Sequence, residues 1–301
     1  MNLNFIFIIE VLMRIDFRLP VLILASLLMG TAVANAQPGS TETASKAETP
    51  PPIQDNSFLI EEAYNQENGV IQHISAFQRM WSSGDWVFTE TDEWPVRTAK
   101  HQLSVMVVAT HAGDHPGSGG GRGDTAFNYR YQILGNGESR VAVSPRLSVL
   151  FATGDPVQGR GFGGTGVQAS LPMSVVLNKW LVSHWNVGTT IIPNQKNISG
   201  QKARACDANL GNSFVWLVNP RFNVLVETVW GSNESVVAPG KTVRSQNLYV
   251  NPGIRWAYNF KNGLQVVPGL GMPIGVGPSS GDRGLFLYLS FEHPFKWAKG
   301  K

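Results

Sequence analysis

Large apolar residues alternate with polar or small residues over long stretches of the chain. In one stretch the apolar set is Leu248, Val250, Pro252, Ile254, Trp256, Tyr258 and Phe260. The set between them is Asn247, Tyr249, Asn251, Gly253, Arg255, Ala257 and Asn259. A period of two is that of a β-strand with one apolar face. The pattern therefore predicts a long two-faced strand, closed by a tight turn at residues 261–263.

The same alternation recurs from residue 69 onward and predicts about twelve strands. The clearest runs cover residues 127–134, 140–153, 167–178, 221–230 and 264–276. The connections between runs are alternately short and long. The short ones are residues 98–100, 135–139, 178–179 and 219–221, and the long ones are residues 113–123, 154–163, 194–205 and 231–242. The prolines within the runs are expected at bulges or strand ends: Pro145, Pro172, Pro252, Pro268 and Pro273.

Alternating tight turns and long loops are typical of a transmembrane β-barrel. A closed barrel pairs every backbone N–H and C=O group, as the apolar bilayer requires. We therefore predict an all-β fold, a closed antiparallel transmembrane barrel of the outer-membrane type with about twelve strands. An even strand count places both ends of the barrel on the periplasmic side. A soluble up-and-down barrel would turn its apolar face inward, and alternation alone does not separate the two.

The start of the chain favours the membrane barrel. A short charged region, residues 13–18, precedes an apolar run at residues 19–32, and Ala34-Asn35-Ala36 follows as a cleavage signal. This is the pattern of a secretory signal peptide. We expect residues 1–36 to be the signal peptide, with an alternative start at Met13, residues 37–56 to be a disordered linker, and residues 57–301 to form the barrel. The expected location is the cell outer membrane.

The assignment of the apolar strand face to lipid and the polar face to the lumen predicts which residues line a candidate solute path. In lipid the apolar residues face outward, among them Leu171, Val224 and Ile254. The predicted lumen-lining residues are Asn128, Arg130, Arg146, His184, Asn223, Glu227, Asn251 and Arg255. In an open lumen the three arginines would form a positive lining that favours anions. The alternative is that these charges pair with one another and plug a narrow barrel.

Composition excludes several classes of partner. The net charge is only +3 and the Lys and Arg residues are scattered, which argues against nucleic acid as a partner. A single cysteine, Cys206, allows no internal disulfide. We expect no cofactor and no metal, and read His111, Asp114 and His115 as part of a polar loop. The expected partners are outer-membrane lipid, a small-molecule solute and the barrel-assembly machinery, which would read Phe295 or Trp297 near the end of the chain.

Several short patterns resemble enzyme motifs. Residues 277–281 match G-x-S-x-G, but a nucleophile elbow needs a strand–turn–helix context. Ser183 with His184, and Ser290 with His293, would point to opposite faces of a strand and could not form a dyad. We expect no enzyme activity, with an outer-membrane lipid hydrolase as the less favoured alternative.

Six stretches carry a resemblance to a known family: NSFLIEEAYNQENGVIQH, SPRLSVLFATGD, GTGVQASLPMSVVLNKWLVSHWNVGTTIIP, NPGIRWAYNF, LQVVPGLGMPIGVG and GLFLYLSFEHPF. They resemble the outer-membrane protein family named after the meta pathway of phenol degradation, over residues 58–295. The resemblance implies uptake or export of aromatic or other hydrophobic small molecules. We therefore expect an outer-membrane channel or transporter for such molecules. The alternative is a non-transporting structural or surface barrel with a plugged lumen.

Overall fold

The computed structural model describes residue Ile53 and residues 57–113, 119–260 and 264–294. Residues 49–301 form one compact unit. The predicted signal peptide and all of the predicted linker except Ile53 lie outside the described residues. The same holds for the turn expected at 261–263, Asp114, His115, Phe295 and Trp297.

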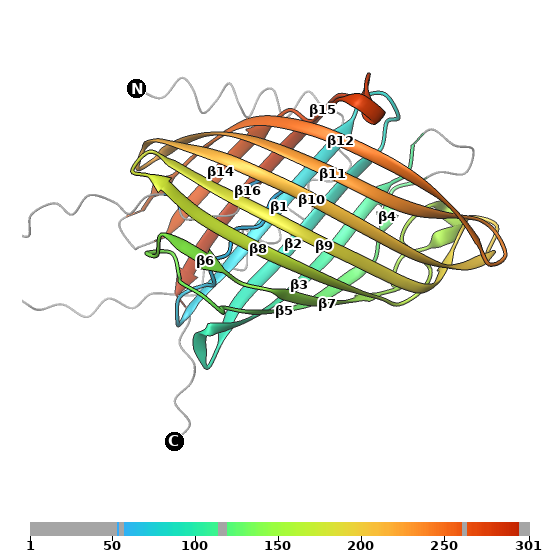
Figure 1. Cartoon of the computed structure of the whole chain (residues 1–301), viewed down its shortest axis with the longest axis horizontal. Helices are drawn as coiled ribbons and strands as arrows, with labels where there is room; N and C mark the ends of the chain where they lie inside the picture. Colours follow the sequence, from blue (N-terminus) through green and yellow to red (C-terminus); the bar gives the residue numbers. More distant parts are fainter. Residues whose placement is uncertain (1–52, 54–56, 114–118, 261–263, 295–301) are drawn as a thin grey trace, which may run out of the picture. The chain divides into compact units, whose positions relative to one another are not determined.

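Nearly all of the regular secondary structure in the described residues is β-strand (Figure 1). The first half contains β1 (Val70–Met80), β2 (Trp86–Val96), β3 (Thr98–His111), β4 (Gly121–Arg122), β5 (Thr125–Tyr131), β6 (Val141–Val143), β7 (Arg146–Phe151) and β8 (Gly166–Asn178). The second half contains β9 (Leu181–Lys196), β10 (Lys202–Asn219), β11 (Phe222–Ala238), β12 (Lys241–Trp256), β13 (Tyr258–Asn259), β14 (Gln265–Gly271), β15 (Ile274–Gly275) and β16 (Gly284–Pro294). Two short 3-10 helices, η1 (Pro156–Gln158) and η2 (Gly277–Ser279), lie in connections. Among the described residues, no helix has the length and apolar character needed to cross a membrane.

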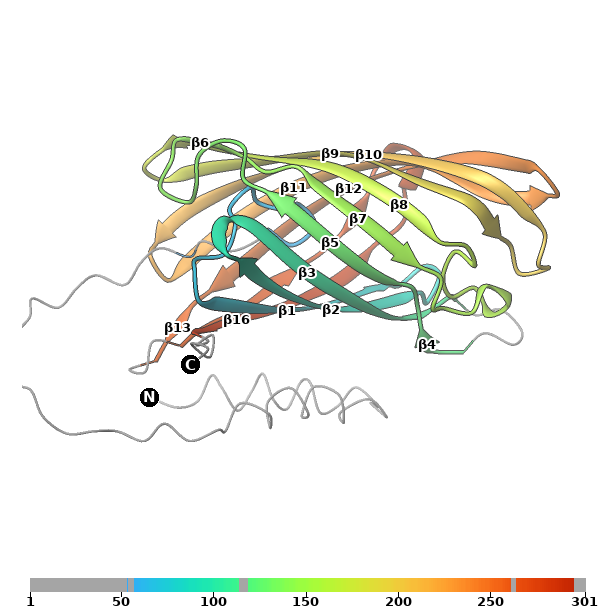
Figure 2. The ribbon, with the colours of Figure 1, turned by 90° about the horizontal axis from the view of Figure 1, so that it is seen from below.

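The strands form one closed antiparallel barrel. The 16 strand segments follow one another around a single sheet, and pairing of β12 with β14 closes it. We call each full strand of the barrel wall, including any short breaks in it, a stave. Four of the segments (β4, β6, β13 and β15) are pieces of longer staves, so the barrel has 12 staves, as the alternation predicts. Figures 1 and 2 show the tilted staves from two sides. β1 begins where β16 ends, since Val70 is opposite Pro294. We call this the terminal end of the barrel.

Alternate residues of each stave point into and out of the barrel. In β5 the polar side chains Asn128 and Arg130 are buried, whereas Phe127, Tyr129 and Tyr131 are exposed. Apolar side chains such as Leu171, Val187 and Leu210 likewise face outward. A soluble barrel would have the reverse arrangement. The polar-in, apolar-out wall is the arrangement of a membrane barrel, and it confirms the predicted direction of the two faces.

Two of the predicted long loops are wrong. β9 and β10 stay paired out to Lys196 and Lys202, so residues 194–205 are mostly strand. β11 and β12 stay paired out to Ala238 and Lys241, and their connection is a tight turn with Gly240 at φ 71°. These segments lack alternation because residues 194–205 are mostly polar on both faces and residues 231–242 place Val236 next to Val237 among polar residues. A backbone hydrogen-bond ladder needs no apolar face, so the strands continue although the period-two signal stops.

The prolines are accommodated in two ways. Pro145 and Pro273 lie between strand segments, in the breaks between β6 and β7 and between β14 and β15. Pro172, Pro252 and Pro268 lie within strands, where the expectation of strand ends or bulges is wrong. Around Pro252 the ladder on one side is short. β12 pairs with β14 only over residues 253–255, and with β15 only at Tyr249 and Val250.

Candidate functional site

All eight predicted lumen-lining side chains are on the inner face of the wall. Seven are buried, and Arg146 is partly exposed. They do not converge on one point, because they come from β5, β7, β9, β11 and β12. Two pairs do touch across β11 and β12. Asn251 Nδ2 donates to Glu227 Oε2 at 2.7 Å, and the Asn223 amide oxygen accepts from Arg255 Nε at 3.2 Å.

Three of these residues belong to a continuous row of polar side chains around the inner wall. The row is Ser174, His184, Ser213, Glu227 and Asn251, each directly opposite the next on neighbouring staves from β8 to β12. We call it the near row, because it lies toward the terminal end. All five residues are buried. These residues are neighbours because antiparallel pairing aligns inward positions of five staves. The polar band that they form cannot be recognised in any short stretch of the sequence.

A non-strand segment of the chain lies along this row inside the barrel. We call residues 57–66 the collar. The Ser57 hydroxyl donates to Ser213 Oγ at 2.8 Å, on β10. Next, the backbone N–H groups of Leu59 and Ile60 donate to Glu227 Oε1 at 2.8 and 3.1 Å, on β11.

The collar then continues around the wall from β9 to β3. Glu61 N–H donates to Asn186 Oδ1 and Ala63 N–H donates to Ser174 Oγ, both at 2.8 Å. Asn65 N–H donates to Gln132 Oε1 at 3.1 Å, and Gln66 N–H donates to Gln102 Oε1 at 2.7 Å. From Leu59 onward the collar thus runs around the wall from β11 to β3, and side chains of the wall accept hydrogen bonds from its backbone, which takes no part in a strand ladder.

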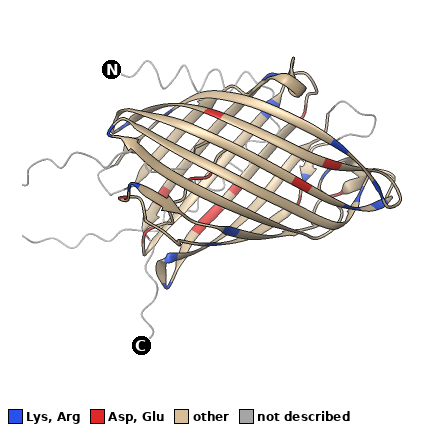
Figure 3. Ribbon diagram, in the orientation of Figure 1, with Lys and Arg blue, Asp and Glu red and all other residues tan. Residues whose placement is uncertain are grey.

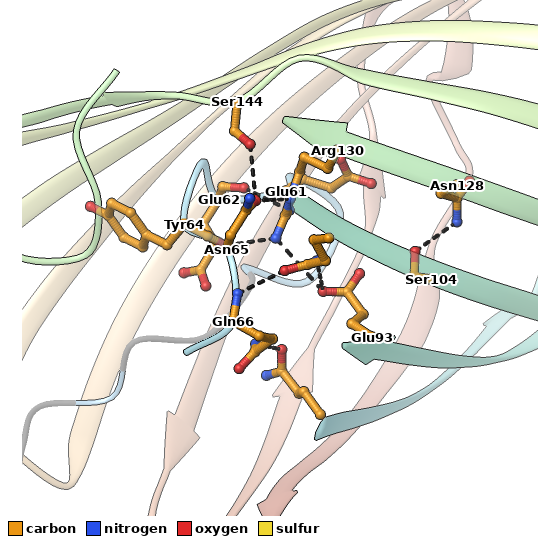
Figure 4. A network of polar contacts seen from close by, with 12 residues as sticks. Glu61, Glu62, Tyr64, Asn65, Gln66, Glu93, Ser104, Asn128, Arg130 and Ser144 are labelled. Carbon is orange, nitrogen blue, oxygen red and sulfur yellow. Dashed lines mark hydrogen bonds and ion pairs between the residues drawn. The ribbon is translucent and has the colours of Figure 1, made fainter. Parts of the chain in front are cut away.

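Arg130 is the centre of the largest group of collar contacts (Figure 4). Its guanidinium donates to Asn65 Oδ1 at 2.9 Å, to the Glu62 carbonyl at 3.2 Å and to the Tyr64 carbonyl at 2.6 Å. The Glu93 carboxylate lies 3.7 Å from the same guanidinium. Arg146 forms a separate ion pair with Glu61 of the collar at 2.8 Å. Two of the three interior arginines therefore bind the collar, and their charges are largely compensated there.

The other end of the collar is anchored by an apolar contact. Phe58 packs in a buried cluster with Val215 and Leu225 on one part of the wall, and with Ile74, Phe286 and Tyr288 on a distant part. Its ring lies 5.3 Å from that of Phe286 and 5.4 Å from that of Tyr288. Glycines make room for it, since a Cβ at Gly253 would lie 2.4 Å from the Phe58 ring. At this level the Phe58 ring joins distant parts of the wall.

Sequence reasoning placed residues 57–68 in the barrel but gave them no role. The available signal was a run rich in Glu, Asn and Gln, without period-two alternation, directly before the first strand. Such a run reads as a loop unless its partners are known. Those partners are inward side chains between 36 and 168 residues away in sequence.

The enzyme-like patterns have structural roles. Ser279 lies in η2, a single 3-10 turn, and its hydroxyl accepts from the Leu248 N–H at 3.1 Å. His184 does contact a serine, but it is Ser174 on the neighbouring stave, with Oγ and Nδ1 2.7 Å apart. That Ser174 hydroxyl also accepts from Ala63 of the collar, and both residues are buried. The contact thus positions the collar.

A polar inner face, an apolar outer face and full closure define the class of protein. The chain is an outer-membrane β-barrel of porin-like architecture, located in the cell outer membrane. This assignment rests on the closed wall, its polar inner and apolar outer faces, and the strand register.

The amino-acid sequence matches no protein-family model and no curated protein. Solved structures with a similar barrel include the NanC porin (12% identity, TM-score 0.48, 75% of this chain and 100% of that one). They also include the KdgM porin (9% identity, TM-score 0.44, 74% of this chain and 98% of that one). A third is the CymD monoaromatic hydrocarbon channel (9% identity, TM-score 0.41, 77% of this chain and 90% of that one).

Proposed function

We propose that the protein is an outer-membrane channel for small molecules and that the collar gates its terminal end. The observation that carries this proposal is the way the collar is held. Its backbone is bound by side chains of the wall and takes no part in the barrel ladder. The barrel can therefore stay closed and paired whether or not the collar occupies its present position.

The energetics of the collar contacts suit a gate. A typical intramolecular hydrogen bond stabilises by only about 0.5–1.5 kcal/mol, because water replaces the lost partner. Water that enters a polar lumen can satisfy both the near row and the collar backbone after they separate. The Phe58 cluster and the Arg130 contacts oppose this separation, so the channel would open intermittently.

Beyond the collar the inner wall is suited to a solute path. A second row, which we call the far row, comprises Ser170, Gly188, Asn209, Gly231 and Asn247. Its side chains are small or polar, and most of its residues are partly exposed. Glycine and serine keep the wall recessed here, and the asparagine amides offer hydrogen bonds to a passing solute.

For the substrate we propose a small molecule with an apolar or aromatic portion. The resemblance to the phenol meta-pathway family implies such a solute. The Phe58, Phe286 and Tyr288 rings would offer it an apolar surface within a polar lumen. The eight inward residues, Asn128, Arg130, Arg146, His184, Asn223, Glu227, Asn251 and Arg255, would bind its polar portion as the collar moves aside. Outer-membrane lipid and the barrel-assembly machinery are the further partners we propose.

A reversible cross-link tests the gate. Ser57 Oγ and Ser213 Oγ are 2.8 Å apart, so cysteines at both positions should form a disulfide that ties the collar to β10. Cys206 is first replaced by serine to remove the single native thiol. In planar bilayers the oxidised S57C/S213C variant should show no conductance or solute flux, and reduction should restore wild-type levels. The S57C and S213C single variants are the matched controls and should conduct under both conditions.

The second candidate function is a non-transporting barrel with a permanently filled lumen. The buried Phe58 cluster, which joins distant parts of the wall, favours it. A wild-type protein without conductance or flux of aromatic solutes would support this candidate and contradict the channel. Conductance that is unchanged by the cross-link would keep the channel but remove the collar as its gate.

A further inference from the structure

The outer, lipid-facing wall carries a cluster of ionisable side chains that the channel function does not use. On β1, Gln72 and Ile74 face inward and are buried, so His73 and Ser75 face outward. On β2, Glu93 faces inward, so Glu90 and Asp92 face outward. His73 is directly opposite Asp92, and Ser75 is directly opposite Glu90. Four polar side chains thus occupy adjacent positions on two paired staves.

This cluster lies within an apolar part of the wall. The outward series along β2 is Trp86, Phe88, Glu90, Asp92 and Trp94, so aromatic residues flank the two carboxylates on both sides. Across the neighbouring ladder, Val105 is opposite Asp92 and Val107 is opposite Glu90. Most of the strand surface carries no charged residue (Figure 3). Charged side chains on the lipid face destabilise a barrel, and ionisable residues within a membrane usually mark function.

The ligand atoms of the cluster converge. One nitrogen of His73 and one carboxylate oxygen each from Glu90 and Asp92 all lie within 4.8 Å of one another. His73 Nδ1 is 2.5 Å from Asp92 Oδ1. One imidazolium could balance only one of the two carboxylates, whereas a divalent cation balances both. An imidazole with two carboxylates is a donor set that suits a transition-metal ion such as Zn²⁺ better than Mg²⁺ or Ca²⁺.

The surrounding residues are placed as the supporting groups of a metal site usually are. The second ring nitrogen of His73, Nε2, lies 3.1 Å from Nε2 of His293 on β16. The His73 ring also stacks on Phe291, with centroids 4.6 Å apart. The Ser75 hydroxyl donates to Glu90 Oε2 at 2.5 Å. A metal-binding histidine commonly donates its other N–H to such a partner, and a ligating carboxylate is commonly hydrogen-bonded in turn.

We infer that His73, Glu90 and Asp92 form a divalent transition-metal site on the lipid-facing wall, best suited to Zn²⁺. His73 Nδ1 and one oxygen from each carboxylate bind the ion, and His293 and Ser75 position two of these ligands. Ligands of one Zn²⁺ ion lie about 2.0–2.2 Å from it, so the His73–Asp92 contact opens slightly to admit the ion. The bound ion neutralises the carboxylates and ties β1 to β2. The inference stands apart from the channel proposal because none of these residues faces the lumen.

The test is a Zn²⁺ titration of the purified protein in detergent micelles, followed by calorimetry, with Co²⁺ absorption reporting on the ligands. We expect one Zn²⁺ per chain and a higher thermal unfolding midpoint with Zn²⁺ present. H73Q, E90Q and D92N should each weaken binding by at least about tenfold, and H293Q by about 10- to 100-fold. The matched control is H101Q, since His101 lies outside the cluster, where it contacts the Tyr129 hydroxyl at 2.6 Å.

Each other outcome contradicts the site. A wild-type barrel that binds no Zn²⁺, or binds it as tightly after D92N and E90Q, would overturn the inference. The carboxylates would then be neutralised by protons or by another chain. Displacement of Zn²⁺ by equimolar Ca²⁺ would also overturn the assignment to a transition metal. Circular dichroism and heat-dependent gel migration establish that each variant is folded, and the two amide variants retain nearly the native shape if H73Q does not fold.

Discussion

The near row and the far row lie on the same five staves, four residues apart along each strand, yet they contact different things. In the near row, Ser174, Ser213 and Glu227 bind the backbone or side chains of the collar. In the far row, the side chains lie against the wall itself. A Cβ at Gly188 would meet the Asn209 amide at 2.6 Å, and one at Gly231 would meet the Asn247 amide at the same distance.

The difference separates the level of the collar from the level beyond it, where we propose the solute path. Side chains that project from the near row bind a non-strand segment. The asparagine and glycine pairs of the far row instead leave the interior beyond that segment recessed. If this comparison is right, substitutions in or beside the near row should loosen the collar, whereas similar changes in the far row should have little effect.

Replacement of Arg130 should have the largest effect on the collar. R130A removes three donated hydrogen bonds and leaves the buried Glu93 carboxylate without its nearby cation. We expect a loss of about 3–5 kcal/mol in the free energy of unfolding, as for other buried charge partners. Urea titrations of the protein in detergent would measure it, with proteolysis within residues 57–66 reporting on the collar. R204A, at an exposed arginine of β10, is the control, and equal effects of the two variants would contradict the role of Arg130.

Glu227 should come next. E227A removes the acceptor of the Leu59 and Ile60 N–H groups and should lower the free energy of unfolding by about 2–3 kcal/mol, because buried donors are left unpaired. E227Q keeps a carbonyl oxygen at the same place and should cost about 1 kcal/mol. The same urea titrations distinguish the two variants. Similar losses in both would mean that the charge of Glu227, rather than its acceptor oxygen, holds the collar.

A pair of glycine substitutions, one beside the near row and one in the far row, should have the smallest effects on the free energy of unfolding. The pair also gives the most direct comparison of the two rows. G253A places a Cβ 2.4 Å from the Phe58 ring and should cost about 1–2 kcal/mol through overpacking. The matched G231A change in the far row meets a movable amide 2.6 Å away and should stay within about 0.5 kcal/mol. A double-mutant cycle of G253A with F58A, measured by urea unfolding, should show coupling between the two sites. If the two effects are additive, the destabilisation caused by G253A does not arise from contact with Phe58.

Different parts of the structure were predictable to different degrees. Period-two alternation is a property of neighbouring residues, so the faces of β5, β8 and β12 could be read directly. The same signal failed at residues 194–205 and 231–242, where β9 to β12 continue as strands without regular alternation. For the candidate site, the eight inward residues could be assigned to the inner face. Their contacts with the collar could not, because register and pairing decide which side chains of different staves become neighbours.

The sequence by itself determined the class of protein: its alternation and turns specify an antiparallel barrel, and its signal-peptide pattern favours the polar face inside. Only the tertiary structure decided what the interior and the outer wall hold. The contacts between Leu59 and Glu227 and between His73 and His293 join residues 168 and 220 positions apart. Alternation assigns each residue to a face but leaves its position around the barrel open. Closure and register set that position, and they bring the collar to the near row and three ionisable side chains to one point on the lipid face.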